Sequence, residues 1–178
     1  DYTREDLVRV IEEKQLERIT FHYTALDGKF KELKIPVANR YQAERVLAEG
    51  ERLDGSSLFK GMVDTSGSDL YVVPIYRTAF LNPFDAGSLD FVCRFLTRDG
   101  EVAPFTLDSI LHKAAALLKQ NTPYELFALG ELEFFLVTDP TSKLFPARRQ
   151  TGYHSAAPFV KSGDILDEMT RTLAQLTG

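Results

Sequence analysis

Apolar side chains recur at helical spacing in four parts of the chain. Residues 3–19 carry an apolar stripe that predicts an amphipathic helix, formed by Leu7, Val10, Ile11 and Leu16. Thr3 can cap this helix, and Asp6 three positions later completes a pattern that resembles a capping box. Similar patterns predict further helices, at 39–50, 106–121 and 164–178.

Strand-like patterns dominate the rest of the first hundred residues. Four segments predict strands, at 19–24, 30–37, 70–76 and 88–97. Asp27-Gly28 is a turn signal that joins the first two strands as a hairpin, and 52–69 has the Gly, Ser and Asp density of a long loop. Two helices and about four strands predict a small α+β domain that ends near residue 100, for which a β-grasp arrangement is one option.

A different kind of segment follows at 129–137, "LGELEFFLV". It reads as a buried central strand that is apolar on both faces, except that Glu131 and Glu133 share one face about 7 Å apart. Two buried like charges are costly unless something neutralises them. Two interpretations stay open: each glutamate pairs with a Lys or Arg of a neighbouring element, or the two hold a divalent cation such as Mg²⁺ or Mn²⁺.

Composition narrows the class of protein. The chain has 178 residues, 44 % of them hydrophobic, and a net charge of −5, which argues against a nucleic-acid role. No segment approaches about 18 uncharged apolar residues, so no membrane span is expected. The single cysteine, Cys93, lies in an apolar strand as a core residue and fits a reducing cytoplasm. His22, His112 and His154 lack the spacing of metal ligands, and His22 is expected to face the surface.

Three short motifs, taken in order, give the chain a recognisable pattern. They are "DGSS" at 54–57, "SDLYVVP" at 68–74 and "ELEFFL" at 131–136. Their order and spacing, over about residues 3–178, resemble the N-terminal part of glutamine synthetase. The resemblance implies a β-grasp domain at 1–100, followed at 101–178 by an incomplete α/β fragment, the first part of the catalytic domain.

The resemblance also implies a function for the parent protein. The family joins ammonia to the γ-carboxyl of glutamate through γ-glutamyl phosphate, with ATP as co-substrate and with Mg²⁺ or Mn²⁺. Asp54 and Ser57 would serve the ammonium side of a neighbouring subunit's active site, Asp69 would be a second loop aspartate, and Glu131 and Glu133 would bind metal. The parent is then expected to be a cytoplasmic homo-oligomer. Most ATP contacts would lie beyond Gly178, so this chain by itself is expected to be inactive.

Several departures from the family pattern leave the substrate open. The usual Asp-Pro-Arg before the first catalytic-domain helix reads "FTLDS" here, no tryptophan stands near residue 60, and Leu-Gly-Glu replaces the commonest Gly-Pro-Glu. Two alternatives therefore remain beside ammonia ligation. One is a γ-glutamyl-amine ligase that uses another amine, and the other is a β-grasp assembly module without catalysis.

Overall fold

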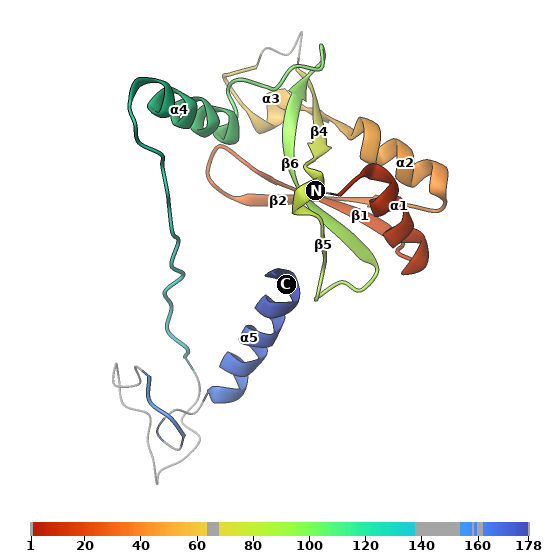
Figure 1. Ribbon diagram of the computed structural model, residues 1–178. Coiled ribbons are helices and arrows are strands. Elements are labelled where there is room, and N and C mark those ends of the chain that lie inside the picture. Colours follow the sequence, from red (N-terminus) through yellow and green to blue (C-terminus); the bar gives the residue numbers. More distant parts are fainter. Residues whose placement is uncertain (1, 64–67, 138–153, 158, 160–161, 178) are drawn as a thin grey trace. The chain divides into compact units, whose positions relative to one another are not determined.

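A computed structural model describes residues 2–63, 68–137, 154–157, 159 and 162–177 (Figure 1). The chain divides into two units, Asp1–Leu126 and Phe127–Gly178. The first unit holds the sheet and most of the described helices, and the described part of the second holds one helix and an extended segment.

The first unit is built on a six-stranded mixed sheet. Its strands are β1 (Arg18–Thr24), β2 (Phe30–Pro36), β3 (Glu51–Asp54), β4 (Asp69–Pro74), β5 (Phe80–Leu81) and β6 (Ser88–Thr97). They follow the order β2-β1-β6-β4-β3, with β5 paired to the free part of β6. The central pair β1–β6 is parallel and all other pairs are antiparallel. The predicted hairpin and the α+β class are confirmed.

The helices that the structure describes in the first unit lie before, between and after the strands. They are α1 (Arg4–Glu13), α2 (Arg40–Glu49), the single-turn α3 (Gly55–Leu58), the 3-10 turn η2 (Tyr76–Thr78) and α4 (Leu107–Asn121). The predicted capping box is present, because Thr3 Oγ1 accepts from the Asp6 amide at 3.2 Å and Asp6 Oδ2 accepts from the Thr3 amide at 3.0 Å. These reciprocal bonds set where α1 begins.

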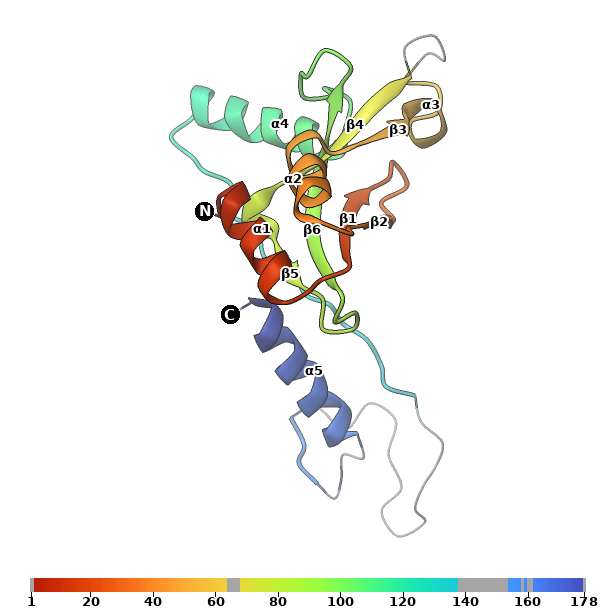
Figure 2. The ribbon, with the colours of Figure 1, turned by 90° about the vertical axis from the view of Figure 1, so that its right-hand side faces the viewer.

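The hydrophobic core lies between the sheet and the pair α1–α2, which pack side by side (Figure 2). Apolar residues of both helices are buried together with strand residues, namely Leu7, Val8, Ile11, Ala43, Val46, Leu47, Ile19, Phe21, Val72 and Phe91. Each fully buried side chain of the Leu, Ile or Phe kind contributes about 1.5–3 kcal/mol of transfer free energy. Cys93 is buried as predicted.

A close approach of two backbones fixes the link from α2 to β3. Gly50 ends α2 with φ +69°, a conformation that side-chain-bearing residues rarely adopt. A Cβ at this position would stand 2.1 Å from the Val72 carbonyl oxygen. Only glycine lets α2 end directly against β4, so that β3 can enter the sheet beside it.

The predicted loop at 52–69 is wrong in part. Within it the structure has β3 and the turn of α3, and Asp69 begins β4. β3 and β5 were not expected, because strands of four and two residues are too short to show an alternating apolar pattern.

The second unit contains α5 (Gly163–Thr177) and the segment that was predicted to be a buried strand. Residues 127–137 form no strand, and Leu129, Leu132 and Val137 are 89 %, 90 % and 92 % exposed. A buried strand needs hydrogen-bonding strands beside it. No described residue of this unit belongs to a strand, so the apolar pattern at 129–137 has nothing to pair with there.

Candidate functional site

Asp54 presents its carboxylate where β3 ends. It is the last residue of β3 and the N-cap of α3. Its Oδ1 accepts from the Ser56 amide at 3.0 Å and from Ser56 Oγ at 2.7 Å, while Oδ2 accepts from Ser57 Oγ at 2.7 Å. Asp54 and Ser57 are both exposed. The motif therefore holds the carboxylate in a fixed direction while leaving it open to a ligand.

These hydrogen bonds also determine the charge of the site. The bond from the Ser56 hydroxyl, then the bonds from the Ser57 hydroxyl and the Ser56 amide, lower the pKa of Asp54 to about 2. The group is fully exposed, so this effect comes from local hydrogen bonding and not from burial. Asp54 is consequently an anion throughout the neutral pH range.

The glycine of "DGSS" is required by packing. The Gly55 amide donates to the Ser68 carbonyl oxygen at 2.7 Å. A Cβ on Gly55 would stand 2.6 Å from that oxygen and 2.7 Å from Leu70 Cδ1. Any larger residue would push α3 away from β4 and turn Asp54 with it.

Asp69, the weaker of the predicted loop residues, lies beside Asp54. The antiparallel register of β3 and β4 pairs Asp54 with Asp69. Arg52 Nη1 lies 3.3 Å from Asp69 Oδ2, and both side chains are more than half exposed. An exposed pair of this kind contributes only about 0–1 kcal/mol. The sheet thus brings two carboxylates and one guanidinium to the same end of the β3–β4 pair.

Glu131 and Glu133 lie in the other unit, in the extended segment. Both are exposed, so the expectation that they are buried is wrong. Among the residues that the structure describes, neither carboxylate has a hydrogen-bond or ion-pair partner, and no group of three or more His, Cys, Asp or Glu could hold a metal ion. Two adjacent carboxylates suit Mg²⁺ or Mn²⁺ chemically, but they supply only part of the six oxygens that such an ion takes.

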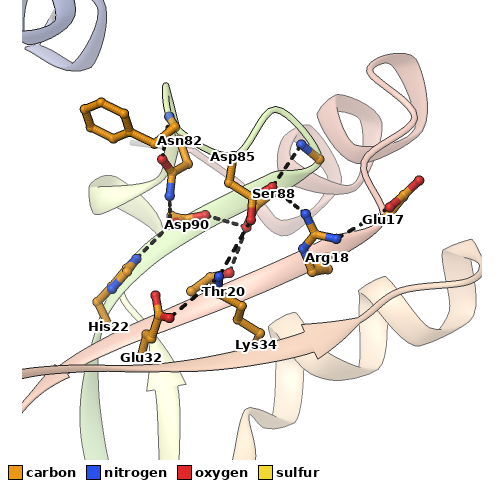
Figure 3. A network of polar contacts seen from close by, with 12 residues as sticks. Glu17, Arg18, Thr20, His22, Glu32, Lys34, Asn82, Asp85, Ser88 and Asp90 are labelled. Atoms are coloured by element: carbon orange, nitrogen blue, oxygen red, sulfur yellow. Dashed lines mark hydrogen bonds and ion pairs between the residues drawn. The ribbon is translucent and has the colours of Figure 1, made fainter.

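A buried polar cluster was missed at the sequence level (Figure 3). His22, expected at the surface, places Nε2 at 2.7 Å from Oδ2 of Asp90, which is completely buried. Asn82 Nδ2 donates to the same oxygen at 2.9 Å and Ser88 Oγ donates to Oδ1 at 2.5 Å. The contact joins residues 68 positions apart through the parallel pair β1–β6, so no local pattern indicates it.

The chain is similar to glutamine synthetases in sequence. The family model for the glutamine synthetase β-grasp domain matches residues 15–98. A glutamine synthetase of Staphylococcus aureus is 30 % identical over 167 residues, which cover 88 % of this chain and 35 % of that protein. A glutamine synthetase of Halobacterium salinarum is 29 % identical over 169 residues, with 92 % and 36 % covered. The chain therefore spans about a third of the length of the curated relatives that it matches.

Solved structures show the same fold. Plasmodium falciparum glutamine synthetase has a TM-score of 0.55 and 21 % identity, over 68 % of this chain and 23 % of that one. GmaS in complex with ADP has a TM-score of 0.56 and 16 % identity, over 65 % and 26 %. At these identities the likeness shows the fold alone, and it confirms the predicted β-grasp arrangement.

Two further observations concern the membrane and the extent of the sequence similarity. None of the helices among the described residues is long and apolar enough to cross a bilayer. The alignment with the Staphylococcus aureus glutamine synthetase covers 88 % of this chain. It therefore extends past the β-grasp match, which ends at residue 98, into the part that contains α4 and the glutamate pair. This chain belongs to the glutamine synthetase family, whose β-grasp domain it carries at residues 15–98.

Proposed function

We propose that this chain is part of an ATP-dependent ligase that joins ammonia to the γ-carboxyl of glutamate through γ-glutamyl phosphate. The observation that carries the proposal is the state of Asp54. Its carboxylate is exposed, oriented by Ser56 and Ser57, and kept anionic by a pKa of about 2. An oriented, exposed anion is what an ammonium ion needs as a docking group.

The same pKa limits what Asp54 does chemically. A carboxylate that binds protons only near pH 2 is a poor general base at neutral pH, because a good base has a pKa close to the working pH. Its role in the proposal is therefore to bind and position the cation. Ser57 and Asp69 would line the same docking place, since both lie at the same end of the β3–β4 pair.

The phosphoryl side of the reaction would use the other pair of carboxylates. Glu131 and Glu133 would supply part of the ligand shell of Mg²⁺ or Mn²⁺. When bound, such ions draw negative charge from the phosphoryl group that ATP transfers. Both glutamates are exposed and unpaired among the described residues, which leaves their oxygens available. The ligands that complete the shell would come from elsewhere in the protein.

The proposal includes assembly. Asp54 is exposed, and the exposed apolar segment at 127–137 needs a cover. Both features suit a cytoplasmic homo-oligomer in which Asp54 and Ser57 act in a neighbouring subunit's site. We expect the 178-residue chain alone to form no glutamine or ADP above the level of a Glu131→Ala control.

The experiment uses the protein produced from the complete reading frame, with glutamate, ATP, Mg²⁺ and either ammonium or methylamine. Asp54→Asn should raise the KM for ammonium at least roughly tenfold, as expected when a charged contact of about 1.5 kcal/mol or more is lost. Asp99→Asn is the matched control, because it removes an exposed carboxylate from the turn after β6. Turnover with methylamine but not with ammonium would make the protein a γ-glutamyl-amine ligase. Absence of turnover with both would favour an assembly module.

A further inference from the structure

A hollow of about 490 Å³ lies at the opposite end of β4 from the Asp54–Asp69 pair. It is bordered by Tyr2, the end of α2, the end of β4, the η2 turn and the C-terminal half of β6. The Tyr76 hydroxyl donates to the Leu47 carbonyl oxygen at 2.8 Å, which ties η2 to α2 and fixes one rim. The hollow therefore has walls from four elements of one unit.

Most of its lining is apolar. Leu47, Val73, Pro74, Ile75 and Leu96 contribute to the walls. These side chains are partly buried, apart from Leu47, which is buried in the core. A volume of this size accepts a small organic molecule, and an apolar lining favours one with a hydrocarbon body.

Two guanidinium groups, those of Arg77 and Arg94, line the same hollow. Nε of Arg94 is buried and makes no hydrogen bond, and its ion pair with Asp108 Oδ2 is long, at 3.9 Å, beyond hydrogen-bond range. Arg77 is exposed and has no ion pair among the described residues.

Several other arginines of the unit lie closer to a carboxylate, within 3.5 Å, in the pairs of Arg9 with Asp6, Arg18 with Asp85, Arg40 with Glu5, Arg45 with Glu51 and Arg52 with Asp69. Arg94 is farther from Asp108, at 3.9 Å, as Arg98 is from Asp99. The chain has 26 acidic against 21 basic residues, so carboxylates are not scarce. At this hollow two guanidinium groups, with no carboxylate within hydrogen-bond range among the described residues, stand beside an apolar wall, and this combination suits an anionic ligand with an apolar body.

We propose that the hollow binds a small organic carboxylate with an apolar body, the carboxylate lying against Arg77 and Arg94 and the body against Ile75 and Leu96. Guanidinium groups are the preferred partners of carboxylates because their planar donors match both oxygens. The site is separate from Asp54 and from the glutamate pair, and it does not depend on the proposed ligase activity.

The test is a titration of the 178-residue chain followed by NMR, with 4-phenylbutyrate as the probe. Two control probes each lack one feature of 4-phenylbutyrate. The neutral 4-phenylbutyramide lacks the negative charge, and inorganic phosphate lacks the apolar body. We expect 4-phenylbutyrate to shift the signals of Leu47, Val73 and Leu96, and the other two probes to shift them little. Arg94→Gln and Arg77→Gln should each weaken binding roughly tenfold. Arg98→Gln, which removes the same charge from the exposed turn after β6, should leave binding unchanged.

Each other outcome counts against the site. Equal binding of the amide would remove the role of the two arginines, and equal binding of phosphate would remove the role of the apolar wall. Shifts that persist in both Arg variants, or that spread over the whole surface, would overturn the proposal. Arg77 is exposed, so Arg77→Gln keeps the test valid even if Arg94→Gln disturbs the fold.

Discussion

Asp54 and Asp69 stand opposite each other in the antiparallel register of β3 and β4, one at the end of its strand and the other at the start. Arg52 contacts Asp69, whereas the hydrogen-bond partners of Asp54 among the described residues are serines. Two carboxylates brought together in this way have different electrostatic surroundings. Only Asp54 combines a fixed orientation with an open side, which makes it the more suitable of the two to receive a cation.

The first prediction concerns the hydroxyl that holds Asp54. Ser56→Ala should raise the pKa of Asp54 from about 2 toward its ordinary value, because the Ser56 hydroxyl is the largest cause of the depression. NMR titration of the Asp54 carboxyl carbon measures this shift. The pKa of Asp27, which is lowered by its own contacts with Lys29, is the internal control and should not move. An unchanged pKa of Asp54 in Ser56→Ala would show that the other bonds suffice.

The second prediction follows from the lowered pKa values of Asp6, Asp54 and Asp85. A carboxyl group whose pKa is lower in the folded than in the unfolded state adds stability above the unfolded pKa, about 3.9, and loses it as pH falls through the folded pKa. The urea midpoint should therefore drop as the pH falls from about 4, near the unfolded pKa, to about 2, which is the pKa of Asp54 in the folded chain. Asp54→Asn should flatten part of this slope, because it lowers the urea midpoint above pH 5 and leaves the midpoint near pH 2 nearly unaltered. If the urea midpoint of Asp54→Asn depended on pH as steeply as that of the unmodified chain, Asp54 would not contribute to the pH dependence of stability.

The third prediction compares two glycines with positive φ. Gly50 and Gly28 have φ values of +69° and +78°, but a Cβ at Gly28 would meet nothing within 4 Å, whereas one at Gly50 would collide with the Val72 carbonyl. Gly28→Ala should cost only the backbone strain of roughly 1–2 kcal/mol. Gly50→Ala should cost clearly more in urea unfolding, because β4 must move. Similar costs for the two variants would mean that the α2–β4 junction adjusts without penalty.

These cases show how far the sequence alone leads. The capping box of Thr3 and Asp6 and the hairpin around Asp27-Gly28 depend on neighbours within a few residues, and both were predictable. The pairing of His22 with Asp90 depends on a parallel strand pair formed by distant segments, which no local pattern contains. The apolar pattern at 129–137 predicts a buried strand, but burial requires partner strands that the described part of its unit lacks. Periodicity indicates what a segment can form, and its partners decide whether it does.

The fourth prediction concerns metal binding by the glutamate pair. Glu131 and Glu133 provide two carboxylates and no further acidic or histidine ligand gathers with them among the described residues. A shell of six oxygens is then mostly water, and Mn²⁺ should bind the 178-residue chain only weakly in calorimetry. Glu133→Ala should change the titration little. A well-defined micromolar site that disappears in Glu133→Ala would mean that the chain completes the shell.

The fifth prediction concerns His22, which lies stacked against Phe30 and Phe80 with ring centroids 5.1 Å and 5.9 Å away. His22→Phe keeps a flat ring in this stack but removes one of the hydrogen-bond partners of the buried Asp90 carboxylate. Losing a buried hydrogen bond to a charged group should cost roughly 1.5–3 kcal/mol in urea unfolding. The loss comes from a buried carboxylate oxygen that has one partner fewer, not from lost packing.

The matched variant is Asp90→Asn, which keeps the shape and removes the charge. In His22→Phe with Asp90→Asn no carboxylate remains to be compensated, so the double variant should be less destabilised than the sum of the two single ones. Asn82 and Ser88 donate to Asp90 in the native chain and are unchanged in both backgrounds, which isolates the His22 contribution. Costs that add to within about 0.5 kcal/mol would show that the two side chains act independently and that the 2.7 Å contact does not hold β1 to β6.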